Sequence, residues 1–263
     1  MKLKIGIIGG GNMGSAILSS IFQKYEVFVC EKDKKRAAFL RRKYNVLSFS
    51  LFSLVRMSDV IILAVKPQDS NTVWPGLKKE MTKEKTLISI AAGLTSSFIE
   101  KKIGGKPRVV RTMPNMPAQI KEGITGIALG KYAKRSDAII ACNIFDNVGK
   151  TVVVEEKWID AITAVSGSGP AYVFYFIENL MNAAKALGLN EKLSKDLVKE
   201  TVSGSVHLFM KYKDVPETLR SRVTSKGGTT EAAIKVLQKK KMDKIYLQAL
   251  RAAQKRAKQL AKK

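Results

Sequence analysis

The stretch of residues 4–17 constrains the fold most strongly, because an apolar run is followed by closely spaced glycines and then by apolar residues at helical spacing. This order predicts a buried strand, a tight turn and a helix. The glycines match G-x-G-x-x-G, in which they permit the turn, let a pyrophosphate approach the backbone and let the helix pack on the strand. The stretch therefore predicts a dinucleotide site; the alternative is a tight turn that binds nothing. The cofactor-binding residues predicted here are Gly9, Gly11, Asn12, Met13 and Gly14.

Strand-like and helix-like segments alternate as far as Glu155, and beyond it almost every segment has helical spacing. Runs that are apolar on both faces are typical of strands in a sheet covered by helices on both sides. We therefore predict an α/β fold, with a Rossmann-type doubly wound sheet over residues 1–155 and an all-helical domain over residues 156–263. The predicted strands are residues 4–8, 26–30, 46–48, 59–65, 86–90, 109–111, 123–129 and 150–154. The helices predicted beyond Glu155 are residues 159–165, 170–187, 194–212 and two segments from Thr230 onward.

Three loops follow predicted strand ends, which is where a doubly wound sheet holds its ligand. The small residues of the second loop either leave room beside a nicotinamide ring or pack backbone against backbone. Two prolines stiffen the third loop, whose asparagine amide can contact cofactor or substrate. The predicted cofactor residues are Ala64, Val65, Lys66 and Pro67 in the first loop, Ala91, Ala92 and Gly93 in the second, and Asn115 in the third.

The end of the second strand carries conflicting signals about the nucleotide. Glu31 lies about 20 residues past the glycines, where an acid accepts hydrogen bonds from a ribose and favours NAD. Lys32, Lys35 and Arg36 follow directly and can instead hold the 2′-phosphate of NADP. We include Glu31 and Lys32 among the cofactor residues and leave the choice between NAD and NADP open.

Two loops stand out in the helical half. Residues 166–172 form a small-residue turn into a helix whose Pro170 suits the first helical turn. Residues 224–231 place a glycine pair before another helix start, where free N–H groups make an anion site suited to a carboxylate. The hydroxyl groups of Ser225, Thr229 and Thr230 converge on this second loop, which favours a binding site over a simple helix cap.

Charge and composition limit the function classes. The formal net charge is +25, from 47 Lys and Arg against 22 Asp and Glu, and basic residues are densest from Lys235 onward, including Lys262 and Lys263. Leucines and alanines recur among these lysines without aromatic residues, so an amphipathic helix with a solvated basic face is favoured over a nucleic-acid surface. We expect no membrane span, no signal peptide, no disulfide framework from Cys30 and Cys142, and a cytoplasmic protein.

Five motifs, in their order and spacing, resemble those of the pyrroline-5-carboxylate reductase family over nearly the whole chain. The resemblance implies a Rossmann domain, a helical domain that interlocks two subunits into a homodimer, and often a ring of such dimers. It also implies NAD(P)H-dependent reduction of 1-pyrroline-5-carboxylate to L-proline, the last step of proline biosynthesis. The motifs are the glycine turn, Ala64-Val65-Lys66-Pro67-Gln68, Arg111-Thr112-Met113-Pro114-Asn115, Ser166-Gly167-Ser168-Gly169-Pro170-Ala171-Tyr172 and Gly227-Gly228-Thr229-Thr230.

The resemblance gives the second helical loop a role in substrate binding. The N–H groups of Gly227, Gly228 and Thr229 would bind the substrate carboxylate, with Ser225 beside them, and the Thr230 hydroxyl would orient the ring nitrogen. Thr230 is thus the predicted catalytic residue. The chain departs from the family pattern at three positions, with Met116 for Thr, Lys226 for Pro and Ser221 for Asp. The lost proline loosens the carboxylate loop, whereas the lysine cation strengthens anion binding.

Other functions are less well supported. His207 is the lone histidine and lies in a predicted helix, so neither a Ser-His-Asp triad nor a metal site is expected. A β-hydroxyacid dehydrogenase has a similar glycine-serine turn but follows it with a lysine acid, where this chain has Val173. The basic C-terminal helix is the sole support for a nucleic-acid-binding protein on a reductase fold.

Overall fold

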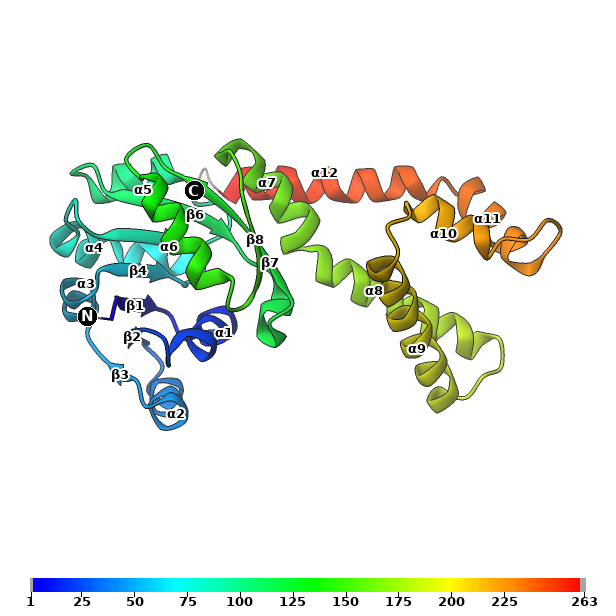
Figure 1. The fold of residues 1–263 in the computed structure, drawn as a ribbon, viewed down its shortest axis with the longest axis horizontal. Coiled ribbons are helices and arrows are strands. Elements are labelled where there is room, and N and C mark those ends of the chain that lie inside the picture. The colour runs from blue at the N-terminus through cyan, green and yellow to red at the C-terminus, as the bar shows by residue number, and fades with distance from the viewer. Residues whose placement is uncertain (1, 261–263) are drawn as a thin grey trace. The chain divides into compact units, whose positions relative to one another are not determined.

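The computed structural model describes residues 2–260 and contains an eight-stranded sheet in the order β3-β2-β1-β4-β5-β6-β7-β8 (Figure 1). Strands β1 to β6 run parallel, in the 3-2-1-4-5-6 order of a Rossmann sheet. The predicted fold class is therefore confirmed. The strands are β1 (Lys4–Ile8), β2 (Glu26–Cys30), β3 (Leu47–Ser48), β4 (Val60–Leu63), β5 (Thr86–Ser89), β6 (Arg108–Met113), β7 (Gly123–Leu129) and β8 (Gly149–Val153).

Strand β7 departs from the parallel arrangement. It pairs antiparallel with β6 and parallel with β8. The link from β6 to β7 holds only the short 3₁₀ helix η2 (Met116–Ile120), and a parallel return would need a crossover of a dozen or more residues. The loop that carries Pro114 and Pro117 therefore reverses the chain at the carboxyl edge of the sheet.

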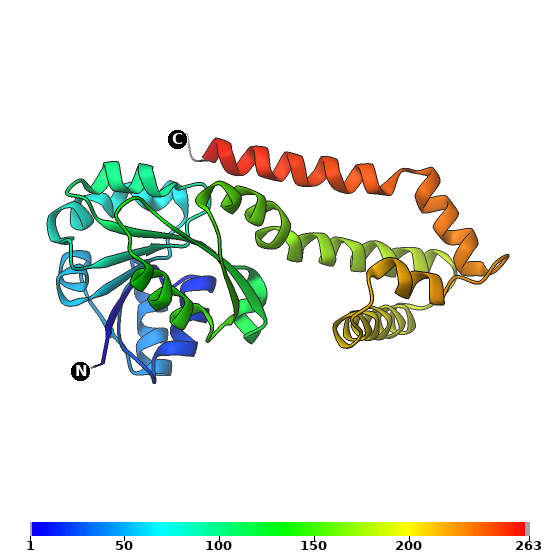
Figure 2. The same cartoon turned by 45° about the horizontal axis from the view of Figure 1, so that its top comes forward.

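Helices cover both faces of the sheet (Figures 1 and 2). On one face, residues of α1, α2 and α6 pack with Ile5, Ile7 and Val110; on the other, residues of α3, α4 and α5 pack with Ile61 and Leu87. The sequence analysis did not predict α3, α4 and α5. These helices are α1 (Asn12–Ile21), α2 (Lys34–Tyr44), α3 (Leu51–Met57), α4 (Trp74–Glu80), α5 (Ser96–Ile103) and α6 (Arg135–Phe145).

The chain forms two compact units: the first runs to Ser168 and resumes at Ala252, and the second is Gly169–Arg251. The first unit extends past the predicted boundary at 155 because the following segment packs on the sheet, where Ile159 is 1% exposed. In the second unit α8 packs against α9. The elements after β8 are α7 (Ile159–Ile162), the π-helix η4 (Thr163–Gly167), α8 (Gly169–Ala186), α9 (Glu191–Lys211), α10 (Pro216–Arg222), α11 (Thr229–Lys239) and α12 (Met242–Leu260); α10 was not predicted.

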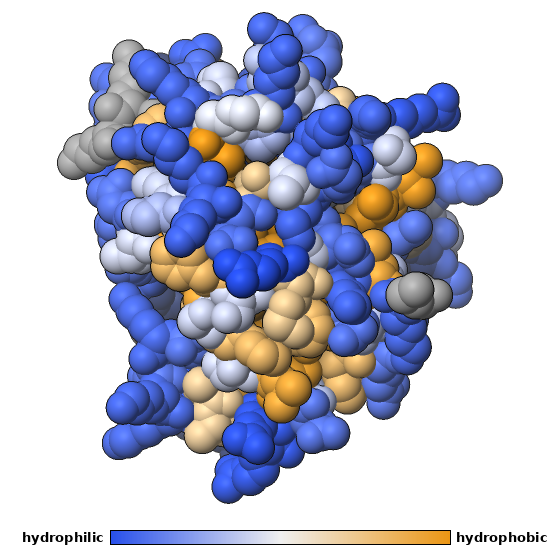
Figure 3. Space-filling view, turned by 90° about the vertical axis from the view of Figure 1, so that its left-hand side faces the viewer, coloured by the Kyte–Doolittle hydropathy of each residue, from blue (hydrophilic) through white to orange (hydrophobic). Residues whose placement is uncertain are grey.

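The surfaces of the two units differ. The face of the first unit in Figure 3 is mostly hydrophilic, with a few apolar groups gathered near its centre. Helices α8 and α9 instead carry many exposed apolar side chains, among them Phe174, Phe176, Leu197 and Phe209. None of the described helices is both long enough and apolar enough to cross a bilayer. Lys262 and Lys263 of the basic segment lie outside the described residues.

Candidate active site

The glycine turn between β1 and α1 has the geometry that its pattern predicts. Gly9 has a φ of +100°, and a Cβ on it would lie 2.7 Å from the carbonyl oxygen of Ala64. A Cβ on Gly14 would overlap the Gly9 carbonyl oxygen, so this glycine brings the helix against the turn. Gly11 caps α1 and faces open space, with nothing within 4 Å of its Cβ position. The free N–H groups at the start of α1 therefore border a space that a phosphate can enter.

Glu31 at the end of β2 is turned toward the glycine turn. Its Oε2 accepts from the Gly10 N–H at 2.7 Å, and its Oε1 accepts from the Asp33 N–H at 2.8 Å. Each carboxylate oxygen still has a second lone pair for a ribose hydroxyl. Burial, and then the Glu31 charge, raise the pKa of the neighbouring Cys30 thiol, which therefore stays protonated at neutral pH.

The three basic residues after Glu31 differ in position. Lys32 is 85% exposed and pairs with Asp69, 3.4 Å away, in the 3₁₀ helix η1 (Pro67–Thr72). Lys35 and Arg36 instead line a groove beside the glycine turn, together with Asn12 and Ser15 of α1. These two cations are thus better placed than Lys32 to meet a nucleotide phosphate.

The loops after β4 and β5 lie at the same sheet edge as the glycine turn. Ala64 and Val65 are half-buried, whereas Lys66 is exposed and caps η1. Ala91 is buried and Ala92 half-buried. Gly93 has a φ of +81°, and its Cβ position falls against Leu260 and Ala257 of α12. Close packing therefore explains the glycine at this position.

Asn115 follows β6, and its Oδ1 accepts from the Ile124 N–H at 2.9 Å. This bond ties the two ends of the proline-bounded loop together. It leaves the side-chain NH₂ group as the part of Asn115 that can reach a cofactor or substrate.

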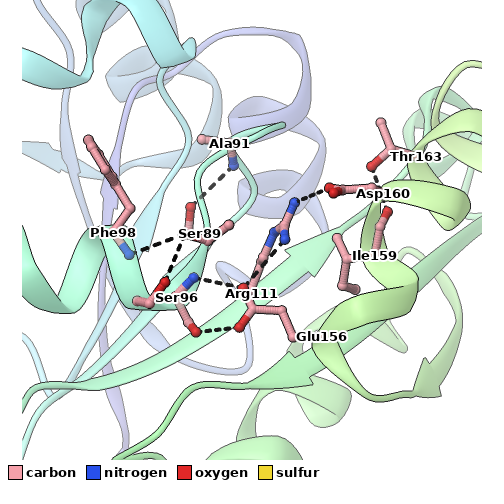
Figure 4. Close-up of polar contacts among 11 residues, drawn as sticks. Ser89, Ala91, Ser96, Phe98, Arg111, Glu156, Ile159, Asp160 and Thr163 are labelled. Carbon is pink, nitrogen blue, oxygen red and sulfur yellow. Dashed lines mark hydrogen bonds and ion pairs between the residues drawn. The ribbon is translucent and has the colours of Figure 1, made fainter. Parts of the chain in front are cut away.

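A charge cluster centred on the buried Arg111 of β6 lies shortly before this loop in the sequence (Figure 4). Arg111, 3% exposed at its side chain, pairs with Asp160 at 2.6 Å and with Glu156 at 3.4 Å. The Glu156 carboxylate also accepts from the Ser96 N–H at 2.7 Å and from the Ser96 hydroxyl. The cluster joins β6, the start of α5 and the segment leading into α7. Arg111 belongs to one of the five motifs, but its partners could not be predicted from the sequence, because Glu156 and Asp160 lie more than 40 residues away.

The first loop of the helical half crosses from the first unit into the second after Ser168, whereas the loop of residues 224–231 lies wholly in the second unit. Ser166 and Gly167 lie in the π-helix η4 of the first unit, a helix type that is frequent at functional sites. Pro170 lies in the first turn of α8, as predicted.

The loop of residues 224–231 leads into α11, whose N-cap is Gly228. Ser225 and Thr229 are exposed, Thr230 is half-buried, and Gly227 has a φ of +74°. The Gly227 N–H already donates to the Glu231 side chain, and the Gly228 N–H donates to the Ser225 carbonyl at 3.0 Å. Sequence analysis did not single out Glu231, although its position four residues after Gly227 was a usable signal. Within residues 2–260 no group of three His, Cys, Asp or Glu side chains could hold a metal.

A Rossmann sheet with an open glycine turn, followed by a helical unit, defines a two-domain oxidoreductase that uses a nicotinamide nucleotide. The chain is 38% identical to the pyrroline-5-carboxylate reductase of Methanosarcina acetivorans, over 99% of this chain and 98% of that protein. It is 33% identical to pyrroline-5-carboxylate reductase 2 of Bacillus subtilis, over 97% and 94% of the two chains. The chain therefore belongs to the pyrroline-5-carboxylate reductase family.

Family models and solved structures agree with this assignment. Residues 156–260 match the family model described as "Pyrroline-5-carboxylate reductase dimerisation". Residues 4–93 match the family model described as "NADP oxidoreductase coenzyme F420-dependent". The reductase structure from Coxiella burnetii has a TM-score of 0.90 at 35% identity and covers 100% of both chains. The Plasmodium falciparum pyrroline carboxylate reductase with NADP bound has a TM-score of 0.88 at 32% identity and covers 98% of both.

Proposed function

We propose that the protein reduces 1-pyrroline-5-carboxylate to L-proline with NADH or NADPH, the last step of proline biosynthesis, and that it acts in the cytoplasm. The observation that carries this proposal is the full-length similarity to reductases of this name, which includes both glycine-bearing helix starts. The free thiols of Cys30 and Cys142 suit a reducing compartment. We divide the roles at residue 155, with cofactor binding before it and substrate binding and dimerisation after it.

The residues of the first unit suit a nicotinamide nucleotide. Gly11 leaves space for the pyrophosphate at the start of α1, where Asn12 and Met13 contribute N–H groups. The loops after β4, β5 and β6 border the same sheet edge and would flank the rest of the cofactor. Their residues are Ala64, Val65, Lys66 and Pro67 in the first loop, Ala91, Ala92 and Gly93 in the second, and Asn115 in the third. When bound, the reduced nicotinamide supplies the hydride.

The adenosine end decides between the two nucleotides. Glu31 would hold the ribose hydroxyls of NADH, whereas Lys35 and Arg36 beside the same turn would hold the 2′-phosphate of NADPH. A carboxylate and a phosphate repel each other at short range, so the two arrangements compete.

The loop of residues 224–231 would bind the substrate. The N–H groups of Thr229 and Thr230 lie in the first turn of α11 and have no helical carbonyl to bond, so they suit the substrate carboxylate. The N–H groups of Gly227 and Gly228 would join them by giving up their bonds to Glu231 and to the Ser225 carbonyl. Ser225 adds a hydroxyl, and Thr230 would orient the ring nitrogen. A cyclic imine nitrogen is basic enough to be protonated before the hydride arrives, so the protein has chiefly to position the reactants.

The second unit would pair two copies of the chain. The exposed apolar side chains of α8 and α9 are too many for a solvated surface, and residues 156–260 match a dimerisation model. We propose a homodimer, which can assemble further into a ring of dimers. Light scattering of the purified protein distinguishes the two, and a monomer at micromolar concentration would contradict both.

The test follows oxidation of NADH and of NADPH, in parallel, with pyrroline-5-carboxylate as substrate. We expect turnover with at least one nucleotide, and the ratio of the two rates decides between Glu31 and the cations. Thr230→Ala should lower kcat without changing cofactor affinity, while Thr82→Ala, at an exposed position between α4 and β5, serves as the matched control. If neither nucleotide is oxidised, the proposed function is wrong. If Thr230→Ala has wild-type kinetics, Thr230 has no part in the mechanism.

A further inference from the structure

A carboxylate of the chain itself occupies part of the substrate loop. Oε2 of Glu231 accepts from the Gly227 N–H at 2.8 Å, which is one of the donors assigned above to the substrate carboxylate. The other side-chain oxygen, Oε1, lies 3.2 Å from Nζ of Lys235, one helical turn further along α11. The loop therefore binds a carboxylate oxygen of its own chain.

Local structure explains why Glu231 takes this position. It lies in the first turn of α11, where the helix dipole favours negative charge, and the positive φ of Gly227 belongs to the turn just before that helix. Its side chain is 30% exposed and that of Lys235 is 68% exposed. Neither partner is deeply buried, so Glu231 can move away from the loop and remain near Lys235.

We infer that Glu231 sets the affinity for the imino acid, because its carboxylate competes with the substrate carboxylate for the loop and leaves when substrate binds. This inference rests on the proposed function. Two carboxylates at adjoining N–H groups of one short loop repel each other, so substrate binding includes the cost of moving Glu231. Lys235 lowers that cost, since it offers the displaced carboxylate a partner on the same helix face.

A plain helix cap would produce the same contact in the free protein, and glutamine separates the two roles. In Glu231→Gln the side-chain carbonyl can still accept from the Gly227 N–H, so a cap is retained, but the competing charge is gone. Glu191→Gln is the matched control, because Glu191 is also an acidic residue in the first turn of a helix, α9.

The experiment measures steady-state kinetics with pyrroline-5-carboxylate for the full-length wild type and its variants. We expect Glu231→Gln to lower KM for the imino acid on the order of threefold to tenfold, with kcat and KM for the nucleotide unchanged. Lys235→Gln should raise the same KM, because Glu231 then has the loop as its main partner. In the Glu231→Gln background Lys235→Gln should have no further effect, and this cycle tests the coupling directly.

Each outcome decides the inference. An unchanged KM in Glu231→Gln, with only thermal stability altered, would show that Glu231 is a helix cap. A raised KM would show that its carboxylate attracts the protonated imine, which also overturns competition. A wild type that is inactive with pyrroline-5-carboxylate contradicts the proposed function itself, whereas an active wild type with insensitive variants contradicts only the role of Glu231.

Discussion

Replacing Gly11 by serine should separate cofactor binding from protein stability. Gly11 is the N-cap of α1 with an ordinary φ of −64°, and its Cβ position has nothing within 4 Å. Serine fits that backbone and is a preferred N-cap residue, so the ligand-free protein should be as stable as the wild type. The added side chain, however, projects into the space assigned to the pyrophosphate.

The expected magnitude follows from ligand linkage. A nucleotide at 100 times its Kd stabilises the wild type by about 2.7 kcal/mol. If serine weakens binding tenfold, the same concentration contributes about 1.4 kcal/mol. The difference is about 1.3 kcal/mol, and for a unit of this size it lowers the nucleotide-induced rise in Tm by roughly 3–5 °C.

The assay is thermal unfolding with and without NADPH, combined with fluorescence titration of the nucleotide. Gly14→Ala is the contrasting variant, because its Cβ would overlap the Gly9 carbonyl and should destabilise the ligand-free protein by about 1–3 kcal/mol. Wild-type nucleotide affinity in Gly11→Ser would refute the placement of the pyrophosphate at this turn.

Two further predictions concern the first unit. Arg111→Met should lower the free energy of unfolding by about 3–5 kcal/mol, because it leaves Glu156 and Asp160 without their cation. The control Arg222→Met breaks an exposed pair with Asp214 and should lower it by less than about 1 kcal/mol. Urea unfolding measures both free energies. Equal losses would contradict the buried cluster. Burial raises the pKa of Glu100, so its contribution to stability is full below the ordinary carboxyl pKa and falls as pH rises through the raised value. Glu100→Gln should therefore gain stability relative to the wild type as the pH rises above about 4, the ordinary carboxyl pKa, and a parallel pH dependence of the two proteins would exclude this effect.

The strands were predictable because their signal is local. Residues 4–8, 26–30 and 123–129 are strands in the structure with the predicted bounds, since each is a short apolar run next to turn residues. The helices α3, α4, α5 and α10 are short, with 7 residues in α3 and 8 in α5, so each shows little more than two turns of periodicity. Caps such as Ser50 and Thr95 were the available signal for two of them.

The remaining features depend on distant parts of the chain. The antiparallel direction of β7 follows from the short connection between β6 and β7, which leaves no room for a parallel crossover. The apolar pattern of a strand does not indicate its direction. The partners of Arg111 come from beyond the sheet, and the pairing of Lys32 with Asp69 joins loops after different strands. The glycine and hydroxyl residues of the candidate site were predicted from their motifs, whereas the contact of Glu231 depends on the backbone of the loop as well as on its spacing from Gly227.

The contact between Gly93 and the end of α12 has a consequence for how the protein matures. A loop assigned to the cofactor packs against Ala257 and Leu260, which the ribosome adds long after the last strand of the sheet. Nascent chains that already contain the entire sheet would still lack this neighbour, so competence to hold the nucleotide should arise only once α12 has been synthesised.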